Sequence, residues 1–161
     1  MPWLNEFFAA IYEFFIGLYG DNLGLHMYGG YPCPTNGFAN QSLYIPIGIF
    51  MILSTLLIAV LFYYAINHPR FNRCYHWLII LLINSGINFF IGFYRTYIDL
   101  STGSICPDLV KDPVSGFINI TNFNCIGFGF VNSIVAMFAF ILISFIIRWW
   151  SKNCSTCPIP N

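Results

Sequence analysis

The chain has 161 residues, of which 58% are hydrophobic, 20% are aromatic and only 7% are charged. A soluble domain is typically about 25% charged, and a fold this small has too much surface to hide so many apolar side chains. This composition excludes a soluble globular protein, and the net charge of zero excludes the basic surface of a nucleic-acid-binding protein. We therefore expect the lipid bilayer as the main partner and no nucleic-acid partner.

Residues 2–19 predict an amphipathic helix. Its acidic face carries Glu6 and Glu13 together with small residues, and its other face is rich in phenylalanine. Because Glu13 interrupts the apolar run, this segment is too short and too polar to cross a hydrocarbon core of about 30 Å. We expect the helix to lie along the membrane interface. Its acidic rather than basic face favours packing against protein over binding to anionic lipid.

Three apolar stretches predict three transmembrane helices, at residues 44–66, 77–98 and 126–147. A basic turn at residues 67–76 joins the first two helices. The sequence thus predicts an all-α integral membrane protein with a single membrane domain covering residues 1–161. The remaining segments are two Cys-containing outer loops at residues 20–43 and 99–125 and a tail at residues 148–161.

The positive residues predict the orientation in the membrane. Lys and Arg gather in the basic turn and near the carboxyl end, at Arg70, Arg73, Arg148 and Lys152. Residues 1–43 carry three acids and no Lys or Arg, so no positively charged leader of a cleavable signal peptide is predicted there. We expect the N-terminus outside and the turn and tail in the cytoplasm, in a plasma or inner membrane.

Four polar residues within the predicted spans are candidate functional residues: Asn84, Asn88, Arg95 and Asn132. An amide in hydrocarbon needs a hydrogen-bond partner. The asparagines could bond one helix to another, or they could line a pore or a water cavity. Arg95 and Asp99 are four residues apart on one helix and are expected to form an ion pair.

The outer acidic residues and the cysteines offer further candidates. Glu6 and Glu13 could ring an outer vestibule that concentrates cations, or they could simply face water. Cys106 and Cys125 flank one outer loop and predict a disulfide, which leaves Cys33 over. On the cytoplasmic side, a weaker candidate for a zinc site or a redox pair is formed by Cys74, His76, Cys154 and Cys157.

No catalytic constellation is recognisable, so we expect neither an enzyme nor a cofactor. The leading hypothesis is a small polytopic subunit of a homo-oligomeric assembly that forms or lines an ion-conducting pore. The second is a non-conducting anchor or accessory subunit of a larger envelope complex, such as a secretion or defence machine. The third is a membrane thiol oxidoreductase, which the absence of a CxxC on the predicted outer side disfavours.

Overall fold

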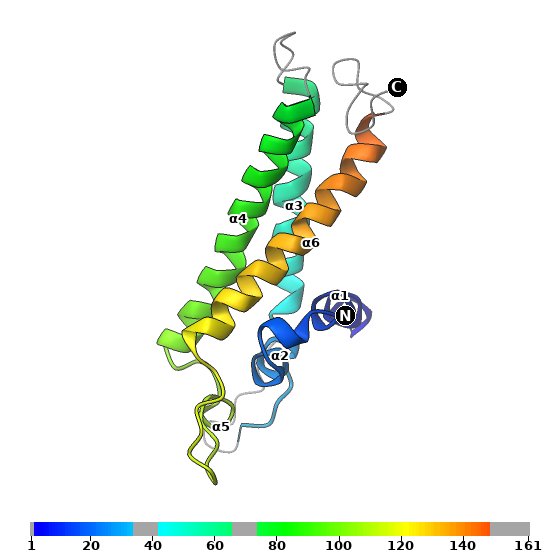
Figure 1. Cartoon of the computed structure of the whole chain (residues 1–161). Helices are drawn as coiled ribbons and strands as arrows, with labels where there is room; N and C mark the ends of the chain where they lie inside the picture. The colour runs from blue at the N-terminus through cyan, green and yellow to red at the C-terminus, as the bar shows by residue number, and fades with distance from the viewer. Residues whose placement is uncertain (1, 34–41, 66–73, 149–161) are drawn as a thin grey trace.

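The computed structural model of the chain describes residues 2–33, 42–65 and 74–148. In that part of the chain, three helices are long and apolar enough to cross a membrane, as predicted. They are α3 (Tyr44–Val60), which continues as the π-helix η2 (Leu61–Ala65), α4 (Cys74–Ser101) and α6 (Asn122–Arg148). Figure 1 shows them side by side in one bundle. The chain is an all-α protein with the architecture of an integral membrane protein.

Two of the three helices are longer than predicted. Helix α4 covers residues 74–101 where 77–98 was expected, and α6 covers residues 122–148 where 126–147 was expected. At about 1.5 Å per residue, each is roughly 40 Å long, which exceeds a hydrocarbon core of about 30 Å. Both helices must therefore tilt or continue into the headgroup region.

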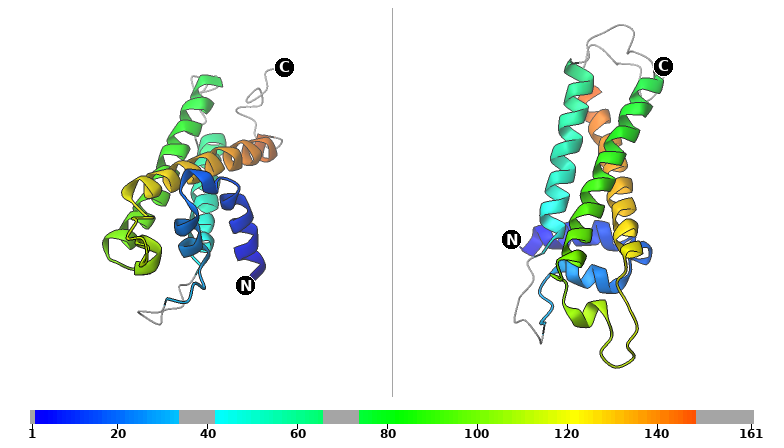
Figure 2. Two further views of the ribbon diagram at one scale, coloured as in Figure 1. Left: turned by 60° about the horizontal axis from the view of Figure 1, so that its bottom comes forward. Right: turned by 90° about the vertical axis from the view of Figure 1, so that its left-hand side faces the viewer.

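Shorter helices gather at one end of the bundle, which we call the capped end (Figure 1). They are α1 (Pro2–Glu13), the 3-10 helix η1 (Ile16–Leu18), α2 (Asp21–Tyr28) and α5 (Pro107–Val110). The right-hand view of Figure 2 shows α1 running across the bundle axis rather than along it. The segment before the first span and the connection between the second and third spans thus meet at the same end of the bundle, as the topology predicts.

Helix α1 has apolar side chains on two faces. Phe8, Ala9 and Tyr12 are buried against the bundle, whereas Trp3 and Phe7 are exposed. A helix that packs one apolar face on protein and leaves another uncovered is suited to the membrane interface, where lipid can contact the second face. The predicted amphipathic helix is present, although it ends at Glu13 rather than at residue 19 and its inner face is aromatic rather than acidic.

Helix α2 lies within residues 20–43, for which only a loop was predicted. Gly20 and Gly29 flank the helix with φ angles of 88° and 84°, a conformation that glycine adopts without strain. Between them, Leu23, His26 and Met27 are buried. Their helical spacing was hidden by the Gly-rich composition of the segment, and their burial against the bundle stabilises a helix that local propensity does not predict.

An aromatic cluster joins the shorter helices α1, η1, α2 and α5, which we call the cap, to the bundle. The ring of Tyr12 in α1 stacks on Tyr44 in α3, with 5.4 Å between centroids. Phe128 in α6 packs edge-on against Tyr19, at 5.3 Å. The Tyr19 and Tyr44 hydroxyls are hydrogen-bonded at 2.9 Å, and burial raises the pKa of Tyr19 to about 12. Aromatic packing of this kind stabilises the fold by more than the burial of apolar area alone would.

The disulfide links Cys33 to Cys106, with 5.7 Å between Cα atoms. The predicted pairing of Cys106 with Cys125 is therefore wrong. Cys125 is a free, fully buried thiol in the first part of α6. Cys106 instead precedes α5, which packs against α2 and so faces the segment that carries Cys33. The pairing depends on this contact between segments that are distant in sequence.

Helix α6 contacts the cap at a glycine. A Cβ atom at Gly127 would lie 2.1 Å from the backbone oxygen of Leu18. Because that neighbour is backbone, it cannot rotate away as a side chain could. Gly127 therefore sets how closely η1 approaches α6, and with it the position of the cap on the bundle.

We expect Gly127→Ala to lower the free energy of unfolding by about 1–3 kcal/mol, because the added methyl forces two backbones apart. Gly86 in α4 is the matched control, since a Cβ atom there meets nothing within 4 Å. Gly86→Ala should leave stability unchanged or raise it by up to about 1 kcal/mol through helix propensity. Denaturant titration in detergent measures both, and equal effects would contradict this packing.

Candidate functional site

Three buried asparagines form what we call the amide cluster, within the bundle. Asn84 and Asn88 come from α4 and Asn132 comes from α6, and all three are 0% exposed. Asn132 Nδ2 donates to the backbone oxygen of Asn88 at 2.7 Å, and Asn84 Nδ2 donates to the oxygen of Ala136 at 3.2 Å. Asn88 Nδ2 donates to the backbone oxygen of Asn84 at 2.9 Å. The first two bonds run in opposite directions between α4 and α6, and the third lies within α4.

Two further helices contribute a hydroxyl each to the amide cluster. Ser54 Oγ from α3 donates to Asn88 Oδ1 at 3.2 Å. Tyr12 OH from α1 donates to Asn132 Oδ1 at 2.7 Å, and burial raises the pKa of this phenol, which keeps it protonated as a donor. Helices α1, α3, α4 and α6 are therefore joined by hydrogen bonds at the amide cluster, as expected for polar groups excluded from water.

The amides are thus partnered within a single chain. This geometry is that of helix-to-helix hydrogen bonding, the first of the two interpretations open from the sequence. The outward surface of the same helices is apolar, and its large exposed side chains include Phe50, Leu53, Leu57, Phe90, Phe138 and Leu142.

The two glutamates of the predicted acidic stripe both lie on α1, at the capped end. Glu6 is exposed and Glu13 is partly exposed. Among the residues that the structure describes, neither carboxylate forms an ion pair. They remain candidates for an acidic surface, and neither is hydrogen-bonded to the amide cluster among the described residues.

A second polar group, the charged cluster, consists of His26, Arg95 and Asp99 at the capped end. Arg95 Nη1 lies 3.3 Å from Asp99 Oδ1, so the predicted ion pair is confirmed. His26 Nε2 of α2 lies 3.6 Å from Asp99 Oδ2. Asp99 is 4% exposed and His26 is 2% exposed, so both are buried. His26 was missed as a site residue because it belongs to the helix that was not predicted.

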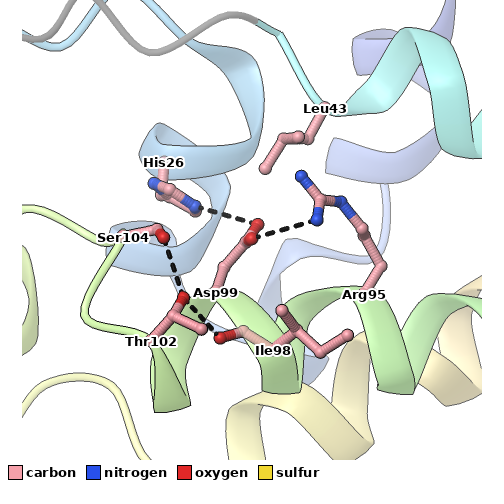
Figure 3. Close-up of a pocket in the computed structure, with 7 residues that line it drawn as sticks. All are labelled: His26, Leu43, Arg95, Ile98, Asp99, Thr102 and Ser104. Carbon is pink, nitrogen blue, oxygen red and sulfur yellow. Dashed lines mark hydrogen bonds and ion pairs between the residues drawn. The ribbon is translucent and has the colours of Figure 1, made fainter.

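The charged cluster lines a pocket of about 490 Å³ (Figure 3). Figure 3 shows the Asp99 carboxylate between His26 and Arg95. The other lining residues are Leu43, Ile98, Thr102 and Ser104. The hydroxyls of Thr102 and Ser104 are hydrogen-bonded to each other at 2.8 Å. The pocket thus offers a cation, an anion and hydroxyl groups within one small volume.

An apolar groove of about 380 Å³ adjoins this pocket. The two cavities share Arg95 and Ile98. The remaining lining residues come from α3 and α4 and are Pro46, Ile47, Phe50, Ile91 and Tyr94. A polar pocket and an apolar groove that meet at one arginine are arranged for an amphiphilic ligand rather than for a small ion.

The weaker zinc candidate is largely beyond what the structure describes. Cys154 and Cys157 lie outside the described residues, and of Cys74 only the backbone is described. Across residues 2–33, 42–65 and 74–148, no group of three or more His, Cys, Asp or Glu side chains is placed to hold a metal ion.

Comparison of the chain with protein-family models, with curated proteins and with solved structures finds no match. The function must therefore be inferred from the geometry.

The bond from Tyr12 to Asn132 makes the amide cluster testable. We expect Tyr12→Phe and Asn132→Leu each to lower the free energy of unfolding by about 1 kcal/mol, the size of an interhelical hydrogen bond in a membrane protein. The double variant should lower the free energy of unfolding by less than the sum of the two single variants, with a coupling energy of about 0.6–1.7 kcal/mol. Tyr28→Phe, on an exposed tyrosine at the same end, is the control. Additive costs would show that the two side chains do not interact.

Proposed function

We propose that this protein is a non-conducting anchor or accessory subunit of a larger membrane complex. The observation that carries this proposal is the amide cluster, which is fully buried and hydrogen-bonded inside one chain. The pore hypothesis relied on Asn84, Asn88 and Asn132 as the polar lining of a shared path. Since these amides are already engaged within the subunit, an assembly of several copies would present apolar helix faces to one another.

We further propose that the capped end faces the outside and the opposite end the cytoplasm. The positive residues of the basic turn and the tail support this orientation. The Cys33–Cys106 disulfide at the capped end also supports it, because disulfides persist in oxidising compartments and are rare in the cytosol. A plasma or inner membrane has such an outer side.

The docking point that we propose is the loop tip, defined as residues 114–118, at the capped end. Val114 is 94% exposed, and Phe117 and Ile118 are also exposed. Exposed apolar side chains grouped on one loop indicate an interaction surface rather than ordinary surface composition. Covering these side chains with a partner protein would remove them from water.

The backbone of the loop tip is held in place by Asp112. Its carboxylate accepts hydrogen bonds from Ser115 Oγ at 2.6 Å and from the backbone N–H of Val114 at 2.9 Å. These two bonds hold the pKa of Asp112 below its usual range, so the carboxylate is ionised at neutral pH. A turn that is already formed loses less conformational entropy when a partner binds.

The proposal predicts no unitary current when the purified protein is reconstituted in planar bilayers. It also predicts that the protein, extracted from its native membrane in mild detergent, has a native mass above that of the isolated chain. Phe117→Ser with Ile118→Ser should reduce that mass, whereas Ser101→Ala, on an exposed residue at the same end, should not. Unitary currents whose selectivity changes with Asn88→Leu would instead support the pore hypothesis.

A further inference from the structure

We infer that the charged cluster and the adjoining apolar groove form one binding site for a phospholipid whose headgroup carries a primary amine. The headgroup would occupy the pocket lined by His26, Arg95 and Asp99, and an acyl chain would lie in the groove between α3 and α4. This site is separate from the loop tip and from the amide cluster, so it does not depend on the proposed role in a complex.

Arg95 supplies the recognition of phosphate. Its side chain is 46% exposed, and one of its nitrogens contacts one oxygen of Asp99. A guanidinium has five N–H donors, so this single contact leaves most of them for another acceptor. Phosphate oxygens are preferred partners of arginine because the planar fork matches their geometry. Since Arg95 lines both cavities, a phosphate bound there would lie where the polar pocket meets the apolar groove.

Asp99 supplies the recognition of the amine. Its Oδ2 atom is buried and makes no hydrogen bond among the described residues. His26 Nε2 lies 3.6 Å from this atom, which is within the range of an ion pair but beyond hydrogen-bonding distance. A buried acceptor without a donor is costly, and the cost is greatest for a charged group. A ligand ammonium in the pocket that donates to the Asp99 carboxylate would offset this cost and would form a charge-assisted hydrogen bond.

The charge of the pocket also favours a zwitterionic headgroup. The positive Arg95 guanidinium and the negative Asp99 carboxylate together have no net charge. A phosphoethanolamine headgroup also has none, and its negative phosphate would face Arg95 while its positive ammonium would face Asp99. Phosphatidylcholine has the same net charge but no N–H donor for Asp99. Phosphatidylglycerol has hydroxyl donors but adds an uncompensated negative charge beside a buried carboxylate.

The groove explains why the ligand would be a lipid rather than a free headgroup. Its lining is apolar except for Arg95, with Pro46 and Phe50 contributed by α3 and Ile91 and Tyr94 contributed by α4. Pro46 lies in the first turn of α3, and Arg95 lies in the last two turns of α4. Both helix ends are therefore at the level where phospholipid headgroups meet acyl chains.

The test measures lipid binding to the delipidated protein by native mass spectrometry. The probes are phosphatidylethanolamine, phosphatidylcholine and phosphatidylglycerol with identical acyl chains. We expect phosphatidylethanolamine to bind about tenfold more tightly than phosphatidylcholine, the ratio expected for one gained charge-assisted hydrogen bond. Equal binding of these two lipids to the unmodified protein would overturn the inference, whatever the variants show.

Variants then assign the two contacts. Asp99→Asn should abolish the preference for phosphatidylethanolamine over phosphatidylcholine, and Arg95→Gln should weaken the binding of all three lipids. The matched controls are Asp108→Asn and Lys111→Gln, which change the same charges at the same end but outside the pocket. A preference that survives Asp99→Asn in a protein of unchanged melting temperature would contradict the assignment of the amine contact.

The same measurement distinguishes a lipid from a soluble headgroup. Glycerophosphoethanolamine, which has no acyl chains, should fail to displace the bound lipid, and Ile91→Trp, which fills the groove, should weaken lipid binding. If glycerophosphoethanolamine competes as well as the intact lipid, then the groove plays no part and the lipid site is disproved.

Discussion

The structure depends on one constraint, which is that a polar group excluded from water must find its hydrogen-bond partner inside the protein. The amides of Asn84, Asn88 and Asn132 meet this requirement through one another, through main-chain oxygens, and through Ser54 and Tyr12. Their bonds fix the rotation of α4 and α6 about their own axes. As a result, the apolar faces of both helices point outward, as a membrane-spanning surface requires.

The cap follows from the same constraint. Tyr12 donates to Asn132, so α1 cannot leave the bundle without breaking a buried hydrogen bond. Gly127 allows η1 to approach α6 closely, and the Cys33–Cys106 disulfide ties the α2 segment to α5. A segment too short to cross the membrane is thereby held across the end of the bundle. This arrangement brings His26 of α2 to Asp99 of α4 and creates the pocket.

Features that depend on local sequence were predictable, and those that depend on distant contacts were not. Hydropathy located the three spans, and the four-residue spacing of Arg95 and Asp99 predicted their ion pair. Helix α2 was not predicted, because tertiary burial stabilises it despite a Gly-rich composition. Two contacts were not predicted for a related reason: the disulfide between Cys33 and Cys106 and the contact of His26 with Asp99. Each requires two segments more than seventy residues apart in sequence to meet.

The burial of the amide cluster is tested most directly by water-edited solid-state NMR of the protein in lipid bilayers, with isotope-labelled asparagine. We expect the side-chain amides of Asn84, Asn88 and Asn132 to receive no magnetisation from water at short mixing times, because each is fully buried. The exposed Asn122 should receive it rapidly and serves as the internal reference. Rapid transfer from water to Asn88 or Asn132 would contradict a dry, internally bonded core.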